Sequence, residues 1–423
     1  MKETIEKIEE LIRSFYQIKV NQEKIDYTRI PLAAPIYDSK EAIRGIRTIL
    51  NGWISQGENV KKFENDFANY IGCYFGIAVN SGSSANLLAL LALKEKYNLQ
   101  DGDEVIIPAA TFATVAMPVI QAGFVPLYVD VSRVTLNIDP KQIEKAISSK
   151  TKIIMPVHTL GYPAEIEKII EIAKKHQLLI IEDCCEAHGS SINGKKVGSF
   201  SDIATFSFFV AHNMTTGEGG MIVTNDLELE SLCKSQREFG RISYETDNNE
   251  RFFTDKILKE YDKRYVFTRL GYNVRMTDVL AAFGIEQLKK LDNMNLKRRE
   301  NAVWLKKKIN SLLKDYFVVP CEESGYYHTY YTFPITLKNN TRFTRNELAK
   351  YLESKGIETR PLFAGCLPDQ PAFRNAPGRT IGNLDNARYL RDKLIFIGIH
   401  PKLEEGHLQY ILDTILFFVK NNI

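Results

Sequence analysis

Long apolar runs are missing from this sequence of 423 residues, and none approaches the length of a membrane-spanning helix. A strong charge of either sign is also missing, because Lys and Arg number 55, Asp and Glu number 52, and the net charge is +3. No basic run is interleaved with aromatic residues. The sequence therefore gives no sign of a nucleic-acid or membrane partner.

Cysteine is scarce as well. The six cysteines form no CxxC pair and no Cys/His grouping at the spacing of metal ligands. We therefore expect no structural metal and no iron-sulfur cluster. Residues 1–18 are acidic and amphipathic, whereas a signal peptide has a basic start and an apolar core, so the sequence favours a reduced, cytoplasmic protein.

What the sequence does contain is an alternation of strand and helix patterns. Apolar residues make up 44% of the chain, enough for a large core, and the length suggests two to three domains. Short β-rich runs alternate with helical ones, and this alternation predicts a mostly parallel sheet of the α/β class. The expected strands are residues 75–80, 104–108, 125–130, 152–157, 178–182, 203–208 and 221–224.

The two ends of the chain differ from this middle part. Apolar side chains at helical spacing predict a helix over residues 5–18, and a long helix of mixed charge is expected over residues 277–305. The expected elements after it are a strand at 330–337 and helices at 345–355 and 405–420. We therefore divide the chain into an N-terminal helical arm (1–35), a large domain (36–290) and a smaller C-terminal α+β domain (291–423).

Three segments carry residues suited to chemistry. Residues 80–85 (NSGSSA) follow a strand and open a helix, where free N–H groups favour a phosphate, although a serine helix cap explains them equally. Asp183 stands just beyond the carboxyl end of an apolar strand, where open α/β sheets bind ligands, or it caps the following turn. His212 also follows a strand, and its imidazole suits proton transfer near neutral pH or serves a structural role.

These three segments, in this order, resemble the DegT/StrS family of sugar aminotransferases, a branch of the fold-type I enzymes that use pyridoxal phosphate (PLP). That family has Ser-Phe, three further residues, Lys, and then Thr-Gly-Glu-Gly-Gly. Here Ser207, Phe208 and Thr216–Gly220 match, and His212 replaces the lysine. The resemblance implies an aspartate aminotransferase-like fold with a mostly parallel central sheet and a smaller C-terminal α+β domain.

The replacement of lysine by His212 is similar to one branch, the nucleotide-sugar 3-dehydratases that make 3,6-dideoxy sugars for O-antigen and lipopolysaccharide. The segments SGSSANLLAL, PVHTLGYP, IEDCCEAHGS and LGYNVRMTD also resemble that branch. His158 and His188 lie in these segments and are interpreted as structural. The cofactor implied is PLP or pyridoxamine phosphate (PMP), held without a lysine Schiff base.

The resemblance assigns five residues to the cofactor phosphate. Gly82, Ser83 and Ser84 would hold it at the start of a helix, and Ser207 would bind it from a neighbouring strand. Asn273 would reach the phosphate of the neighbouring subunit, which implies a homodimer, although it also suits a helix cap before residue 277.

Four further residues are assigned to the cofactor ring and to the reaction. Phe112 would stack on the ring, although a core aromatic residue is the simpler reading of its type. Asp183 would pair with the pyridine nitrogen, and Glu186 would lie beside the ring hydroxyl. His212 would be the acid/base, because a histidine transfers protons without forming an imine with the cofactor.

The reaction implied is PMP-dependent removal of the C3 hydroxyl from a nucleotide-linked 4-keto-6-deoxyhexose, carrying GDP or CDP, with an amino donor such as glutamate. Two alternatives stay open. One is a nucleotide-sugar aminotransferase that uses free PMP, and the other is a noncatalytic relative that binds ligands. No lysine lies between Lys196 and Lys234, which makes lysine assistance to an aminotransferase less favourable.

Two departures from the family pattern narrow this interpretation. One group of dehydratases holds an iron-sulfur cluster through cysteines after a segment like residues 237–241, but residues 242–246 here contain none. Phe209 stands where the dehydratases usually have tyrosine. Arg241, Arg269, Arg275 and Arg360 suit phosphate or carboxylate contacts or surface ion pairs, and the sequence assigns none of them.

Overall fold

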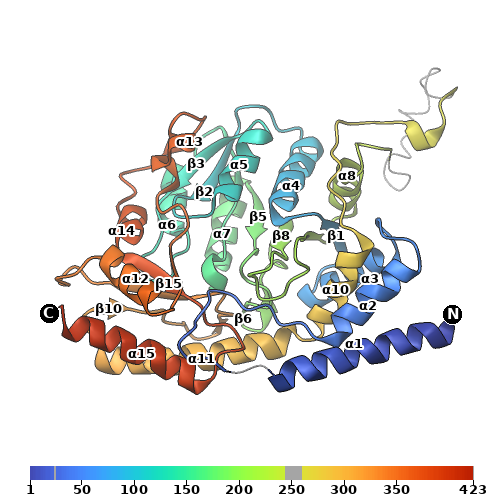
Figure 1. The fold of residues 1–423 in the computed structure, drawn as a ribbon. Helices are drawn as coiled ribbons and strands as arrows, with labels where there is room; N and C mark the ends of the chain where they lie inside the picture. The colour runs from blue at the N-terminus through green and yellow to red at the C-terminus, as the bar shows by residue number, and fades with distance from the viewer. Residues whose placement is uncertain (23–24, 243–259, 423) are drawn as a thin grey trace.

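The computed structural model describes residues 1–22, 25–242 and 260–422 (Figure 1). Its centre is an eight-stranded sheet in the order β1-β9-β8-β5-β4-β2-β3-β14, in which only β9 runs antiparallel to its neighbours. The strands of this sheet are β1 (Phe75–Val79), β2 (Glu104–Pro108), β3 (Val125–Val129), β4 (Thr151–Ile154), β5 (Leu179–Asp183), β8 (Ile203–Ser207), β9 (Gly220–Thr224) and β14 (Arg379–Thr380). The predicted α/β class with a mostly parallel sheet is confirmed.

Helices cover both faces of this sheet (Figure 1). Ile77 and Val79 of β1 point into the core shared with α4, α5 and α8, whereas Ala78 between them points into the core beneath α3. Strands buried on both faces explain why their sequences are continuous apolar runs. The helices of this part are α2 (Ser39–Leu50), α3 (Glu58–Ile71), α4 (Gly82–Lys96), α5 (Ala113–Gln121), α6 (Pro140–Ala146), α7 (Ile166–His176), α8 (Leu227–Arg237) and α10 (Asp278–Leu288).

The C-terminal part has its own four-stranded antiparallel sheet in the order β10-β12-β15-β13. Its strands are β10 (Phe317–Val318), β12 (Phe333–Leu337), β13 (Thr359–Pro361) and β15 (Leu394–Ile397). The helices here are α11 (Leu291–Leu312), α12 (Arg345–Ser354), α13 (Pro371–Arg374), α14 (Asp385–Lys393) and α15 (Glu405–Lys420). A small three-stranded sheet joins β11 (Tyr326–Tyr327) to the hairpin of β6 (Ser191–Ile192) and β7 (Lys195–Lys196).

The N-terminal arm is the helix α1 (Lys2–Gln22), which packs against α2 along the lower edge of Figure 1. After it, Ile30 pairs with Ile357 and is buried in the core of the C-terminal part. The C-terminal part in turn supplies β14 to the large sheet. The domain boundaries at residues 35 and 290 stay predictions. None of the described helices combines the length and the apolar character needed to cross a membrane.

Two predicted elements differ from the structure. The long helix expected over residues 277–305 is two helices, α10 and α11, separated at Lys289 and Lys290. Lys290 donates to Asp38 and Glu41, and Leu291 after it is buried in the core. These tertiary contacts stabilise the break, and the mixed charge of the segment did not show it. The strand expected from residue 330 starts at Phe333, because Tyr330 has a left-handed φ of +47°.

Candidate active site

A cavity of about 640 Å³ opens where the carboxyl ends of the parallel strands meet. The segments that follow β1, β2, β5 and β8 all contribute to its wall, as do residues of β13 and β15 from the C-terminal part. Open α/β sheets bind ligands at this edge. Of the predicted site residues, the wall includes Gly82, Ser83, Phe112, Asp183, Glu186, Ser207 and His212.

The N-terminus of α4 forms part of the cavity wall. Ser81 caps this helix by accepting a hydrogen bond from the backbone N–H of Ser84. A Cβ atom on Gly82 would lie 2.6 Å from Cβ of Ser207 and 3.0 Å from Sγ of Cys185, so only glycine fits here. This close approach brings Gly82, Ser83 and Ser207 together on one wall, at the positive end of the helix dipole.

Ser84 and Asn273 do not line the described cavity. Ser84 Oγ donates to Asn80 Oδ1 at 2.7 Å, so its hydroxyl takes part in the helix start. Asn273 is exposed, and its Oδ1 accepts hydrogen bonds from the guanidinium of Arg275. Asn273 is therefore not part of the cavity wall that the described residues form, and its role toward a neighbouring subunit stays a prediction.

Asp183 is buried at the end of β5 with both carboxylate oxygens in hydrogen bonds. Asn86 Nδ2 donates to Oδ2 at 2.9 Å, and the backbone N–H of Cys185 donates to Oδ1 at 3.0 Å. Asn86 is itself fixed, because its Oδ1 accepts a hydrogen bond of 2.6 Å from the Thr205 hydroxyl. These contacts hold the carboxylate in one orientation at the cavity wall.

Glu186 is a second buried carboxyl in the same wall. Burial raises its pKa to about 8, the hydrogen bond from the Leu160 N–H opposes that change, and the charge of Asp183 adds to it. At neutral pH Glu186 is therefore protonated. A neutral carboxylic acid can donate a hydrogen bond, which a carboxylate cannot do.

The raised pKa of Glu186 predicts a pH-dependent stability of the cofactor-free protein. Between the ordinary carboxyl pKa of 4.5 and about 8, the folded protein holds one proton more than the unfolded chain. The free energy of unfolding should therefore fall by ~1.4 kcal/mol per pH unit in this window. The variant Glu186→Gln lacks this term, so urea unfolding of both proteins should give a difference that grows with pH. A difference that is constant with pH would contradict the assignment.

His212 is presented by the loop between β8 and β9. The loop closes on itself through hydrogen bonds from Phe208 N to Gly219 O at 2.9 Å and from Thr216 N to Phe208 O at 3.0 Å. A Cβ atom on Gly219 would lie 2.5 Å from Oγ1 of Thr216, and the φ of Gly217 is +83°. The two glycines are therefore required by the tight loop that directs His212 to the cavity.

The His212 ring lies among aromatic rings and one buried cation. Its centroid is 5.1 Å from the ring of Tyr331, 5.8 Å from His188 and 6.3 Å from Phe209. Burial, and after it the positive charge of Arg298, lower the pKa of His212 to about 3. His212 is therefore neutral at physiological pH and available to accept a proton.

Aromatic residues form the outer part of the cavity. Phe112 is 54% exposed and contacts Phe363 at a ring distance of 6.0 Å. An exposed ring at the mouth of a cavity is not a core residue, so the alternative interpretation of Phe112 as a core aromatic residue is wrong. Phe209 also lines the cavity, without a polar group to offer. Arg360 is the one arginine in the cavity wall within the described ranges, and it donates to the carbonyl of Thr359 at 2.7 Å.

Comparison with known proteins gives a family and close relatives. Residues 37–416 match the DegT/DnrJ/EryC1/StrS aminotransferase family. The chain belongs to this family. It is 38% identical to the lipopolysaccharide biosynthesis protein RfbH of Salmonella typhimurium, over 91% of this chain and 90% of that protein. It is also 38% identical to the GDP-perosamine synthase of Escherichia coli O157:H7, over 79% of this chain and 84% of that one.

Among solved structures, this member of the family is similar to an E. coli GDP-4-keto-6-deoxy-D-mannose-3-dehydratase with bound hydrated PLP. The TM-score is 0.84 at 31% identity, and the match covers 92% of this chain and 99% of that one. The fold-type I prediction is therefore confirmed, and the family resemblance stated from the sequence is correct. The relatives support PLP-dependent modification of nucleotide sugars. They include both dehydratases and aminotransferases, and the two groups are similarly close to this chain in sequence.

The cavity fits the family's cofactor. The family and the PLP-bound relatives support PLP or PMP as the cofactor of this chain, in agreement with the sequence. Gly82 leaves room for a phosphate beside Ser83 and Ser207, and the buried carboxylate of Asp183 faces the same cavity. A phosphate at a helix start and a carboxylate partner for a ring nitrogen are the two contacts that such a cofactor needs.

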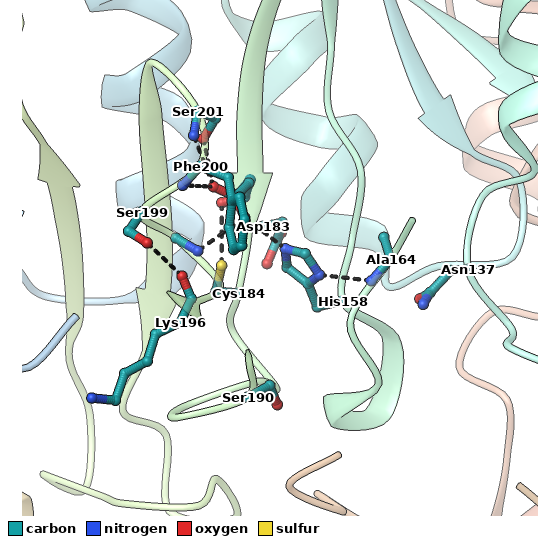
Figure 2. A network of polar contacts seen from close by, with 12 residues as sticks. Asn137, His158, Ala164, Asp183, Cys184, Ser190, Lys196, Ser199, Phe200 and Ser201 are labelled. Carbon is teal, nitrogen blue, oxygen red and sulfur yellow. Dashed lines mark hydrogen bonds and ion pairs between the residues drawn. The ribbon is translucent and has the colours of Figure 1, made fainter. Parts of the chain in front are cut away.

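Behind Asp183, a buried polar network fixes the end of β5 (Figure 2). His158 Nδ1 accepts from the Ala164 N–H at 2.9 Å, so Nε2 carries the proton and donates to Glu182 Oε2 at 3.0 Å. Glu182 also accepts from Gly198 and Ser201. Burial opposes ionisation, but these hydrogen bonds hold the pKa of Glu182 below its usual range.

The same network explains the grouping of His158, Glu182 and Cys184, whose possible metal-binding atoms lie within 4.8 Å of one another. Both ring nitrogens of His158 and the Glu182 carboxylate already take part in protein hydrogen bonds. These hydrogen bonds show that the three residues form a structural network, and His158 is part of it, in agreement with the structural role expected for this residue. The segment 242–246, which lacks the cluster cysteines of one group of dehydratases, lies outside the described residues except for Ile242.

The sequence missed several residues that shape the site. Ser81 and Asn86 belong to the recognised helix start, and the polar Asn86 within an apolar helix was a usable signal. Arg298 and Tyr331 come from segments more than 80 residues away from His212, and no local pattern marked them, whereas the sequence named Arg360 as a candidate for phosphate or carboxylate contacts without assigning it. Only the packing of the C-terminal part against the large sheet brings them to the cavity.

Proposed function

We propose that this protein catalyses the PMP-dependent removal of the C3 hydroxyl from a nucleotide-linked 4-keto-6-deoxyhexose, a step in 3,6-dideoxysugar biosynthesis. The observation that carries the proposal is the composition of the cavity wall. The wall contains His212, Asp183 and Glu186 but no lysine among the residues that the structure describes. The cofactor is therefore held without a covalent bond, and an imidazole is the group available to move protons beside it.

Each wall residue has a defined part in this proposal. Gly82, Ser83 and Ser207 hold the cofactor phosphate, and Asp183 pairs with the pyridine nitrogen. When bound, PMP supplies a primary amine for a ketone and a ring that stores electrons. Glu186, protonated before the cofactor binds, is placed to donate a hydrogen bond to an oxygen on the ring.

His212 serves as the proton carrier. Its imidazole is neutral because burial and Arg298 keep its pKa low, so its free ring nitrogen would be able to accept the proton lost from the carbon beside the amine of bound PMP. The same imidazole then returns a proton to the sugar side as hydroxide leaves C3. A lysine at this position would instead bond to PLP and compete with the free amine form.

The substrate and partners follow the family pattern. The cavity of about 640 Å³ is large enough for a cofactor and a sugar ring, which leaves the nucleotide toward the mouth. Arg360 at that mouth suits a bidentate contact with a phosphate of GDP or CDP, or with the carboxylate of a donor such as glutamate. Asn273, exposed and outside the cavity, fits the proposed homodimer by reaching the neighbouring subunit's phosphate.

The proposed reaction has a fixed stoichiometry, which can be measured from its products. With glutamate as donor, one sugar and one glutamate give one 3-deoxy sugar, one 2-oxoglutarate and one ammonia. The sugar is reduced at C3 as glutamate is oxidised, and the water lost from the sugar is used in hydrolysis. We expect purified protein with PMP, glutamate and a GDP- or CDP-4-keto-6-deoxyhexose to release ammonia and 2-oxoglutarate in equal amounts.

The two alternatives give different products in the same experiment. The similarity to a GDP-perosamine synthase favours the aminotransferase as second candidate. An aminotransferase would form an amino sugar and 2-oxoglutarate without ammonia, and that result would replace the proposal. A protein that binds PMP but turns over none of the sugars would be a noncatalytic relative.

A further inference from the structure

A second, much smaller cavity adjoins His212. Its volume is about 10 Å³, and His212, Asn213 and Arg298 contribute to its wall. His212 also lines the large cavity, so this residue lies between the two. A space of this size accommodates about one water molecule.

Three buried polar atoms on these residues have no hydrogen-bond partner within the described ranges. They are Nδ1 of His212, Oδ1 of Asn213 and Nε of Arg298. A buried polar atom left without a partner destabilises the folded protein. Small polar cavities with two to four such partners hold ordered water, whereas dry cavities are apolar.

The orientation of the Asn213 amide is fixed by its other contacts. Its Nδ2 donates to Asn295 Oδ1 at 2.8 Å and to the carbonyl of Thr329 at 3.1 Å. A carbonyl can only accept, so the nitrogen must face Thr329 and the oxygen must be the free atom. Asn213 Oδ1 is therefore an acceptor in need of a donor.

Arg298 provides the opposite kind of group. Its side chain is buried, Nη1 donates to the carbonyl of Tyr331 at 3.1 Å, and no ion pair with a carboxylate is found for it in the described part of the chain. An arginine Nε carries a hydrogen at every pH of interest. Arg298 Nε is therefore a permanent donor in need of an acceptor.

We propose that one water molecule binds in the small cavity, accepts a hydrogen bond from Arg298 Nε, donates one to Asn213 Oδ1, and contacts Nδ1 of His212. With one lone pair and one hydrogen used, the water keeps one of each for the imidazole. It accepts from Nδ1 when this atom carries a proton and donates to it when it does not. Arg298 and Asn213 are thus positioning residues that act on His212 through this water.

This inference rests on the proposed function, because it explains how His212 keeps a partner while it gains and loses a proton at its other ring nitrogen. The neutral ring with its proton on Nδ1 is the base, and the imidazolium, with a proton on both ring nitrogens, is the acid. In both of these forms Nδ1 donates a hydrogen bond to the water. The water also accommodates the other neutral tautomer, because it can donate a hydrogen bond to Nδ1 when this atom carries no proton.

Three substitutions of Arg298 separate the donor from the charge. Arg298→Gln places an amide nitrogen near the position of Nε and removes the charge. Arg298→Lys keeps the charge but has a methylene there, and Arg298→Met has neither. We expect crystal structures of the wild type and of Arg298→Gln, loaded with PMP, to contain the water, and those of the other two variants to lack it.

The reaction rate gives a second readout. Arg298→Gln is expected to stay within about threefold of the wild type, and Arg298→Lys and Arg298→Met to fall at least about tenfold, as part of the 10²–10⁴-fold that acid-base catalysis contributes. The nitrogen NMR signals of His212 should show a mixture of both neutral tautomers in the wild type. Activity retained in Arg298→Lys but lost in Arg298→Gln would overturn the inference in favour of the charge alone.

Failure of this inference is distinguishable from failure of the proposed function. If the wild-type crystal structure shows Nδ1 of His212 bonded to a protein atom, with no water beside Arg298, the inference is wrong whether or not the sugar is deoxygenated. If the water is present but no sugar substrate releases ammonia, the water site stands and the dehydratase proposal fails. An equal loss of activity in all three Arg298 variants, with the folded structure disturbed, would indicate a purely structural arginine.

Discussion

The His212→Lys variant is expected to bind PLP covalently and to lose the removal of the C3 hydroxyl. The substitution puts a primary amine on the loop between β8 and β9, in the wall shared with Asp183 and Ser207. That amine can condense with the aldehyde of PLP, whereas an imidazole cannot. Loss of the proton carrier should lower the dehydration rate by about 10²–10⁴-fold. Borohydride reduction followed by intact-mass measurement detects the covalent cofactor, and released ammonia measures the reaction.

A matched control is available on the surface. His176 lies in the last turn of α7, outside the cavity wall, and His176→Lys makes the same chemical exchange there. This control should leave dehydration unchanged and should acquire no reducible bond to PLP. A His212→Lys protein that binds PLP tightly, but never forms a covalent bond with it, would refute the placement of His212 beside the cofactor.

Asp183→Asn is expected to have the second large effect. The substitution keeps the size of the side chain but removes the charge that would keep the pyridine nitrogen protonated, so the ring would store electrons poorly. Removing one such electrostatic contact lowers kcat by about 10²–10³-fold. PMP should still bind through Gly82, Ser83 and Ser207, since these residues are unchanged. Single-turnover kinetics with saturating PMP separate the rate effect from binding.

The hydrogen bonds of Asp183 predict a cost in stability for the same variant. Both of its oxygens accept hydrogen bonds, from Asn86 and from the Cys185 N–H, but an amide offers only one oxygen. One donor would face the amide NH₂, at a cost of about 1–3 kcal/mol in unfolding free energy. Asp202→Asn is the matched control, because its contact with the Ile180 N–H needs a single oxygen. Equal loss of activity in both variants would contradict the role of Asp183.

Several elements of the fold were predictable because local and tertiary preferences agree in them. The strand at 104–108 and the helix at 405–420 occur with the expected bounds. Asp183 could be placed at a ligand site because the carboxyl ends of parallel strands meet at one edge. The break between α10 and α11 was not predictable, since it depends on ion pairs of Lys290 with Asp38 and Glu41, about 250 residues away.

In the candidate site, too, some features were predictable from the sequence, and others depend on tertiary packing. The sequence named Gly82, Ser83 and Ser207, but the packing of Gly82 against Ser207 and Cys185 became visible only in the structure. Ser84 was named with them, and the structure puts its hydroxyl in the helix start instead. Which serine faces the cavity depends on the rotation of α4, which tertiary packing sets.

His212 shows most clearly which features follow from the sequence and which follow from the tertiary structure. The sequence by itself determined that an imidazole replaces the family's lysine, because that is a matter of residue identity within a recognisable motif. What surrounds it follows from the tertiary structure: Tyr331 and Arg298 come from distant segments, and burial of the His212 ring together with the charge of Arg298 keeps His212 neutral. The protonation state of a buried side chain depends on desolvation and on neighbouring charges, and both arise only when the chain is folded.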